Sequence, residues 1–313
     1  MAERHVKCRA EGLDDMKHEY ADINGIRMHY VTHGSGEPIL LLHGFPEYWG
    51  VWKKLLADLS KDYRVIAPDL RGYNLTSQPK GVENYRIELL VADVRALADH
   101  LGLRQLTLVC QDWGALLGWS FALRHPDYVR RFVTINMTHP ALLNRDLREN
   151  PRQQQASQYM LGFRTPGSAE AIKDKDFAFP RQFLFGVARQ HGAQLSDEDI
   201  AEWIEGWKRH PDALDAQLNY YRATELGPPD GKGSPGGSNL LDGVPEAQWK
   251  TRFPVLVLMA TEDPYLLEDG FKGLEQLVPE LTFQKIPGAS HWVALEKPDV
   301  IIRHLRDFIA QKR

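Results

Sequence analysis

Short apolar runs that alternate with helical patterns constrain the fold of this 313-residue chain more than any other feature. Continuous apolar runs are typical of parallel strands buried on both faces. Strands that alternate with helices indicate a parallel α/β sheet. Two earlier runs joined by Asn24-Gly25 indicate a hairpin. The expected strands are 18–23, 26–32, 38–42, 63–67, 106–110, 131–135, 254–259 and 281–286, and the expected helices include 51–59, 87–101, 270–277 and 298–310.

The alternation stops in the middle of the chain. Residues 140–250 contain no convincing buried strand, and their aromatic and charged residues recur at helical spacing, with Ser196 as the expected N-cap of one helix. Gly and Pro crowd residues 227–243, which indicates an exposed loop. We therefore expect an α/β core formed by 1–139 and 251–313, with 140–250 inserted as a helical cap.

Composition excludes several classes of protein. The chain is 43% hydrophobic and 26% charged with a net charge of −4, and it has no basic block, so we expect no nucleic-acid or membrane partner. No stretch reaches transmembrane length, and the first residues have no apolar run typical of a signal peptide. The two cysteines, Cys8 and Cys110, fit a reducing compartment. We expect a cytoplasmic protein, and a homodimer is compatible with the sequence, which leaves the oligomeric state open.

The stretch Leu106-Thr-Leu-Val-Cys-Gln-Asp-Trp-Gly-Ala-Leu-Leu-Gly118 places one carboxylate where a strand turns into a helix. Small residues on both sides of Asp112 suit a tight turn, and the positive end of the helix favours the ionised carboxylate. The pattern is that of a nucleophile elbow with Asp in place of Ser. The alternative is a buried aspartate that caps an ordinary helix.

Two further candidates follow later strands. Asp263 comes after the strand at 254–259, and His291 comes after the strand at 281–286. Active sites of open sheets gather at the carboxyl ends of the strands, and the order nucleophile, acid, histidine is that of α/β-hydrolases. Glu262 is a rival to Asp263, but Pro264 fixes the turn after Asp263. The expected oxyanion donors are the backbone N–H groups of Phe45 and Trp113.

On these motifs the chain resembles the epoxide hydrolases of the α/β-hydrolase fold. The resemblance implies a mostly parallel eight-stranded sheet with an inserted helical cap. His43, Pro46 and Trp49 are expected to border the substrate pocket, with His43 shaping its loop by hydrogen bonds. The matching segments are His43-Gly-Phe-Pro-Glu-x-Trp49, Arg71-Gly-Tyr73, Gln111-Asp-Trp-Gly114, Asn136-x-x-x-Pro140 and Gly288-x-x-His-Trp292.

The resemblance also implies two cap tyrosines that hold the epoxide oxygen. Tyr159 precedes Phe163-Arg-Thr-Pro-Gly-Ser-Ala-Glu170, and Tyr221 lies in Leu218-Asn-Tyr-Tyr-Arg222, where Tyr220 is the neighbouring alternative. The implied reaction converts a small lipophilic epoxide and water to a vicinal diol through an ester on Asp112, which a water activated by His291 and Asp263 then hydrolyses. No metal or organic cofactor is expected.

Two other functions stay open at this point. A haloalkane dehalogenase would use the same Asp112 and His291, with the Trp113 indole as one halide donor and a cap tryptophan, Trp203 or Trp207, as the second. A ligand-binding protein that has lost turnover would keep the pocket without forming a product.

Overall fold

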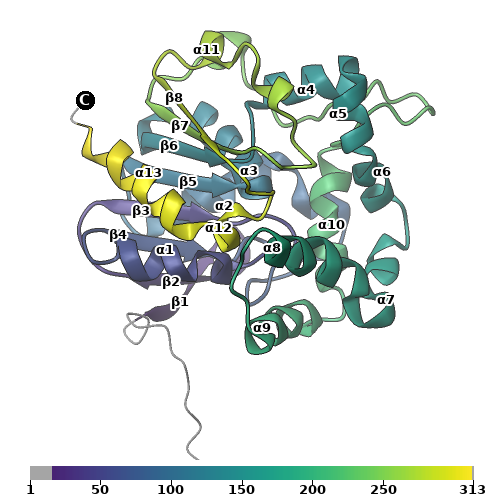
Figure 1. Cartoon of the computed structure of the whole chain (residues 1–313), viewed down its shortest axis with the longest axis horizontal. Helices are drawn as coiled ribbons and strands as arrows, with labels where there is room; N and C mark the ends of the chain where they lie inside the picture. The colour runs from purple at the N-terminus through teal and green to yellow at the C-terminus, as the bar shows by residue number, and fades with distance from the viewer. Residues whose placement is uncertain (1–15, 312–313) are drawn as a thin grey trace, which may run out of the picture.

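The structure is a computed structural model that describes residues 16–311, with an eight-stranded sheet at its centre (Figure 1). The spatial order of the strands is β1-β2-β4-β3-β5-β6-β7-β8. The pairs β1/β2 and β2/β4 are antiparallel, and every later pair is parallel. The strands are β1 (Lys17–Ile23), β2 (Ile26–His33), β3 (Pro38–Leu42), β4 (Arg64–Pro68), β5 (Leu106–Gln111), β6 (Val129–Ile135), β7 (Val255–Ala260) and β8 (Leu281–Ile286).

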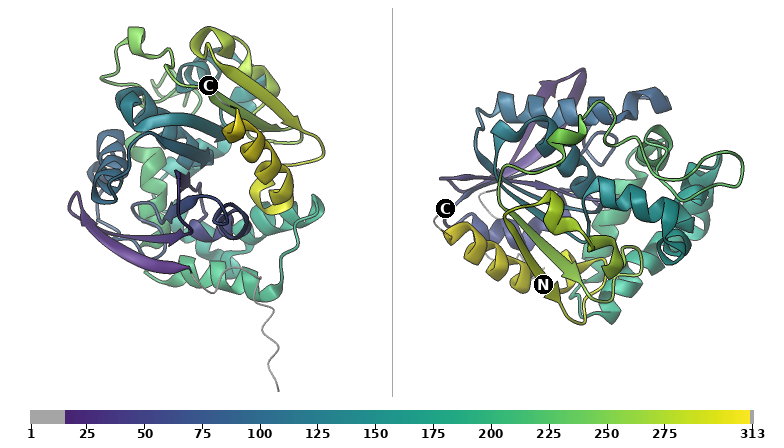
Figure 2. Two further views of the ribbon diagram at one scale, coloured as in Figure 1. Left: turned by 90° about the vertical axis from the view of Figure 1, so that its left-hand side faces the viewer. Right: turned by 90° about the horizontal axis from the view of Figure 1, so that it is seen from above.

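Burial of the central strands explains their apolar runs. All six residues of β5 and all six of β7 are buried, because helices cover both faces of the sheet. Helices α1 and α13 pack together on one face, and α2 and α3 pack together on the other (Figures 1 and 2). The helices and 3₁₀ turns of this part are η1 (Trp49–Trp52), α1 (Lys53–Leu59), η2 (Val82–Tyr85), α2 (Ile87–His100), α3 (Asp112–Arg124), η3 (Pro126–Tyr128), η6 (Glu268–Phe271), α11 (Leu274–Leu277), α12 (Val293–Glu296) and α13 (Pro298–Ala310).

Helices α4 to α10 gather at one end of the sheet, and we call them the cap (Figures 1 and 2). Several hydrogen bonds cross the boundary between cap and core, including four that each join a side chain to a backbone carbonyl. The donors are Gln153, Trp207, Tyr220 and Trp292, and the acceptors are Tyr265, Pro46, Arg71 and Phe183. The elements are α4 (Pro140–Glu149), α5 (Pro151–Ala156), α6 (Gln158–Arg164), α7 (Ser168–Pro180), the π-helix η4 (Arg181–Gly186), α8 (Val187–Gln190), α9 (Asp197–Lys208), α10 (Ala213–Ala223) and, after them, the short 3₁₀ turn η5 (Glu246–Gln248).

The structure corrects three details of the expected elements. The helix expected at 51–59 begins with the 3₁₀ turn η1. The helix expected at 270–277 is broken into η6 and α11, because Gly273 adopts a left-handed backbone with φ +90°. The loop 227–243 is not fully exposed: Leu240 and Leu241 are buried. Cys8 lies outside the described residues, and among residues 16–311 no helix has the length and apolarity to cross a bilayer.

Candidate active site

The strand-to-helix turn holds Asp112 in a conformation that few residues adopt. Its φ is +49°, in the left-handed region, which costs about 1–3 kcal/mol for a residue other than glycine. The sharp turn brings strand and helix close together. A Cβ on Gly114 would lie 2.2 Å from the carbonyl oxygen of Leu42. The sequence therefore needs glycine at 114 if Asp112 is to stand at the carboxyl end of β5.

A second close approach fixes the orientation of the carboxylate. The backbone N–H of Phe45 donates to Oδ1 of Asp112 at 2.7 Å. Gly44 lies against the same side chain: a Cβ there would come within 2.4 Å of the Asp112 Cβ and 2.5 Å of Oδ1. The N–H of Trp113 lies in the first turn of α3, where backbone N–H groups have no partner within the helix. Oδ1 is thus held by the predicted oxyanion donor Phe45, which leaves Oδ2 for chemistry.

Replacing Gly44 with alanine is expected to lower kcat/KM by about 100-fold, because a shift of one ångström in a reacting group has that effect. The new methyl group has no room beside Asp112, so the carboxylate must move. Steady-state kinetics of the purified variant, on an epoxide as the resemblance implies, measure the change. The matched control is Gly162→Ala in α6, where an added Cβ meets nothing within 4 Å. Equal activity of both variants would show that the position of Asp112 is not critical.

The structure brings His291 and Asp263 to the nucleophile. Nδ1 of His291 donates to Oδ2 of Asp263 at 2.7 Å, and its Nε2 lies 3.3 Å from Oδ2 of Asp112. The other oxygen of Asp263 accepts backbone N–H groups from Tyr265 and Leu266. Glu262, the rival acid, is exposed and pairs with His191. The geometry therefore selects Asp263 over Glu262 as the partner of His291.

The charge state of His291 follows from its neighbours. Burial lowers its pKa, but the charge of Asp263 and the hydrogen bonds to Asp112 and Asp263 outweigh burial and hold the pKa well above 6.5. The imidazole beside Asp112 and Asp263 is therefore protonated. If Asp112 became a neutral ester, His291 would lose one of these anions and its pKa would fall.

The cap places both predicted tyrosines over the carboxylate. Tyr159 from α6 and Tyr221 from α10 line the same cavity as Asp112 and His291. Burial and the charge of Asp112 raise the pKa of both phenols well above 10, so both keep their protons. The O–H of Tyr220 instead donates to the carbonyl of Arg71 at 2.8 Å. The structure therefore separates Tyr221 from its neighbour.

Three residues expected at the pocket do not line this cavity. His43 is fully buried, with Nδ1 bonded to the carbonyl of Gly44 and Nε2 accepting the N–H of Leu70. The carbonyl of Pro46 accepts the indole N–H of Trp207. Trp49 packs edge-on against Tyr48 and His18. The assignment of His43, Pro46 and Trp49 to the pocket is corrected: the Phe45 backbone and ring reach the site, and the flanking residues support the loop.

Several contributors were missed from the sequence. Tyr265 lines the cavity and packs edge-on against both His291 and Tyr159. Its place two residues after Asp263 was the available signal. The side chain of Asn136 donates to the carbonyl of His291 and accepts the N–H of Ala260, which ties the loop of His291 to β7. The remaining apolar wall consists of Phe163, Phe179 and Phe183 from the cap, together with Trp292, which packs against Phe183.

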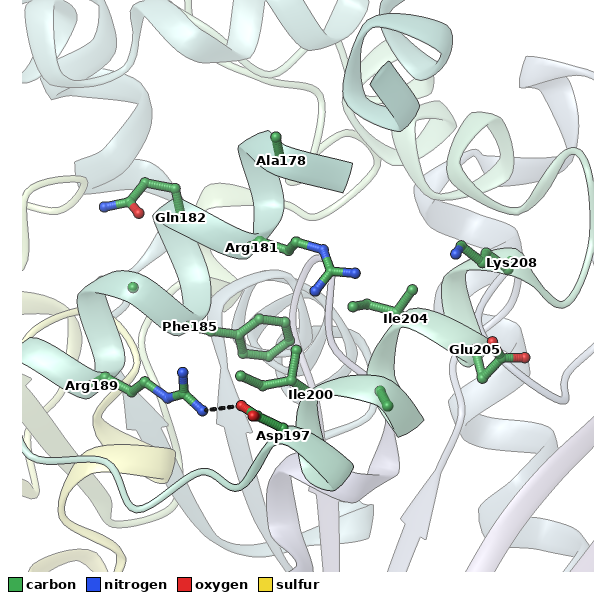
Figure 3. Close-up of a pocket in the computed structure, with 12 residues that line it drawn as sticks. Ala178, Arg181, Gln182, Phe185, Arg189, Asp197, Ile200, Ile204, Glu205 and Lys208 are labelled. Carbon is green, nitrogen blue, oxygen red and sulfur yellow. Dashed lines mark hydrogen bonds and ion pairs between the residues drawn. The ribbon is translucent and has the colours of Figure 1, made fainter. Parts of the chain in front are cut away.

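A larger cavity, of about 710 Å³, lies between η4, α8 and α9 and contains none of these groups (Figure 3). Its three basic side chains are paired: Arg189 with Asp197, and both Arg181 and Lys208 with Asp176. We therefore place the active site in the smaller cavity at Asp112. Within residues 16–311, no three His, Cys, Asp or Glu side chains are grouped so that they could hold a metal ion.

A family model described as the alpha/beta hydrolase fold matches residues 37–298. The chain belongs to the α/β-hydrolase fold family. Within this family it is 32% identical over 297 residues to epoxide hydrolase 3 of Xenopus tropicalis, which covers 92% of this chain and 76% of the relative. It is 29% identical over 310 residues to epoxide hydrolase 2 of Caenorhabditis elegans, and the match covers 97% of this chain and 83% of the relative.

A solved structure gives the same result. A mutant of an epoxide hydrolase from Bacillus megaterium superposes with a TM-score of 0.86 at 31% identity, covering 94% of this chain and 100% of that one. These comparisons confirm the predicted resemblance to α/β-hydrolase-fold epoxide hydrolases and the predicted fold class.

Proposed function

We propose that this protein is an epoxide hydrolase that converts a lipophilic epoxide and water to a vicinal diol through an ester on Asp112. The observation that carries the proposal is one cavity that contains a carboxylate, two protonated phenols from the cap and an imidazole paired with Asp263. The names of its relatives support the same activity. We further propose that 140–250 acts as the cap and that 1–139 and 251–313 form the core.

Ring opening requires a nucleophile and an acid. Oδ2 of Asp112 attacks an epoxide carbon, the bond from that carbon to oxygen breaks, and Tyr159 or Tyr221 gives its proton to the oxygen. A carboxylate is already a nucleophile at neutral pH, so it needs no base. The raised pKa of the two phenols keeps them protonated until charge develops on the oxygen.

Hydrolysis uses the change in the charge of Asp112. Once Asp112 is an ester, the pKa of His291 falls. His291 then gives its proton to the tyrosine that protonated the epoxide oxygen, which restores the phenol. Neutral His291 then takes a proton from water as the oxygen of that water attacks the ester carbonyl carbon. The Phe45 N–H already bonded to Oδ1, with the N–H of Trp113, stabilises the tetrahedral oxyanion. The bond between this carbonyl carbon and the ester oxygen Oδ2 then breaks, and the proton of the new carboxyl group passes to the departing alkoxide. This step forms the diol and restores the ionised carboxylate of Asp112.

The dehalogenase alternative lacks its second halide donor. The indole N–H of Trp207 donates to the carbonyl of Pro46 at 2.7 Å, and Trp203 packs against Tyr48 and Phe185. Neither tryptophan lines the cavity at Asp112, whereas two tyrosines do. The cavity therefore favours an epoxide oxygen over a halide.

The test compares two substrates with the purified protein. We expect diol from styrene oxide, no halide from a bromoalkane, and no product with Asp112→Asn. Diol is measured by chromatography, and halide by ion chromatography. Halide release without diol formation would favour a dehalogenase. Saturable binding of styrene oxide without either product would favour a binding protein.

A further inference from the structure

The space at the catalytic groups is divided into two unequal chambers. The outer chamber has a volume of about 190 Å³ and the inner one about 20 Å³. The same five side chains line both, so the chambers meet at the reacting groups. The shared residues are Asp112, Tyr159, Tyr221, Tyr265 and His291.

The outer chamber suits one aromatic ring. Its remaining wall consists of aromatic side chains, and Phe179 is 49% exposed, which places that end of the chamber at the protein surface. A dry apolar cavity of about 150 Å³ holds a benzene molecule. A volume of about 190 Å³ therefore accommodates a phenyl group beside the epoxide.

The inner chamber is closed by apolar side chains. Leu143 of α4, Met160 of α6 and Leu226 are all buried and line it. The amide of Gln153 also lines it, but that amide is bonded to Ser157 and to the backbone of Tyr265 and Leu267. A volume of about 20 Å³ is close to the 10–15 Å³ that one water molecule needs. The chamber has room for hydrogen on an epoxide carbon, but not for an ethyl group.

We infer that the enzyme discriminates against epoxides that carry a trans substituent of ethyl size or larger on the second ring carbon, and that Leu143 helps to set this limit. The inference rests on the proposed function, because it places the epoxide oxygen on the phenols and the ring carbons against Asp112. Trans substituents on the two carbons point to opposite sides of the ring. One then enters the outer chamber, and the other is directed at the wall that includes Leu143.

The test uses styrene oxide and trans-1-phenyl-1,2-epoxybutane, which carries an added ethyl group on the second ring carbon. For the wild-type protein we expect kcat/KM for styrene oxide to exceed kcat/KM for the ethyl-substituted epoxide by at least about 100-fold. This is near the upper range of discrimination against a misfitting apolar group. Leu143→Ala removes more carbon atoms than the ethyl group adds. That variant is expected to reduce the ratio of kcat/KM for styrene oxide to kcat/KM for the ethyl-substituted epoxide by at least about tenfold.

The matched control is Leu142→Ala, which shortens the neighbouring buried side chain of α4 without touching the inner chamber and should leave the ratio unchanged. If Leu143→Ala does not fold, Leu143→Val serves as a milder variant. The ratio of kcat/KM for the two epoxides is measured on the wild-type protein, so the size limit itself is tested without any variant. Similar kcat/KM values of the wild-type protein for the two epoxides would overturn the inference while leaving the function intact. A ratio that Leu143 and Leu142 variants change equally would overturn the role of Leu143. Diol from neither epoxide would overturn the function itself.

Discussion

His291→Gln is expected to stop the reaction halfway, with the substrate attached to the protein. The substitution removes neither Asp112 nor the hydrogen bond from the Phe45 N–H to its Oδ1, so ring opening can proceed. Glutamine cannot take a proton from water, so the ester persists. Intact-protein mass spectrometry after incubation with styrene oxide should show one added substrate molecule, and steady-state diol formation should fall by about 100-fold or more.

The control is His125→Gln, a histidine just beyond the opposite end of α3, packed against Phe121 and Tyr128. It should turn over epoxide like the wild-type protein and show no added mass. Rapid diol formation by His291→Gln would mean that His291 is not the base.

Removing both cap phenols is expected to have the other large effect, on ring opening alone. Tyr159→Phe combined with Tyr221→Phe leaves no protonated phenol from the cap helices α6 and α10 at the epoxide oxygen. General acid catalysis contributes about 10²–10⁴-fold, so the rate of ring opening by the double variant should fall by about 100-fold or more. Each single variant should lose less, because one donor remains. The measurement is the rate at which added mass accumulates in the His291→Gln background, which isolates this step.

The matched control is Tyr220→Phe, next to Tyr221 on α10. Its O–H bonds to the carbonyl of Arg71 outside the cavity, so its loss should reduce the free energy of unfolding by about 1–3 kcal/mol and leave the rate of adduct formation unchanged. Tyr220 acting like Tyr221 would contradict the assignment of the phenols.

The order of strands and helices could be predicted because burial on both faces leaves continuous apolar runs, as in β5 and β7. The N-terminal hairpin could be predicted because Asn24 and Gly25 both tolerate the positive φ of its turn. The break at Gly273 could not, since a glycine inside a helical pattern does not reveal its own φ.

Within the site, the residues at strand ends were the predictable ones. Asp112, Asp263 and His291 follow β5, β7 and β8, and parallel strands bring their carboxyl ends together. The loop after β3 was harder, because Phe45 lines the cavity whereas His43 and Trp49 do not. A motif gives the loop but not the direction of each side chain.

The aromatic wall of the cap was not predictable for a different reason. Helix α7 is interrupted by non-helical backbone at 174–177, and the following η4 is a π-helix. Helical periodicity therefore does not indicate where Phe179 and Phe183 point, and the structure shows that both line the outer chamber. The size of that chamber, and with it the expected substrate class, required the structure.

The central claim is that Asp112 becomes covalently bound to the substrate, and the most direct measurement locates the mass added to His291→Gln. The tryptic peptide from Gln105 to Arg124 contains Asp112 as its one carboxylate side chain and Cys110 as its one thiol. Tandem mass spectrometry of that peptide is predicted to place the substrate on Asp112. Substrate on Cys110, on another peptide or on none would contradict the account.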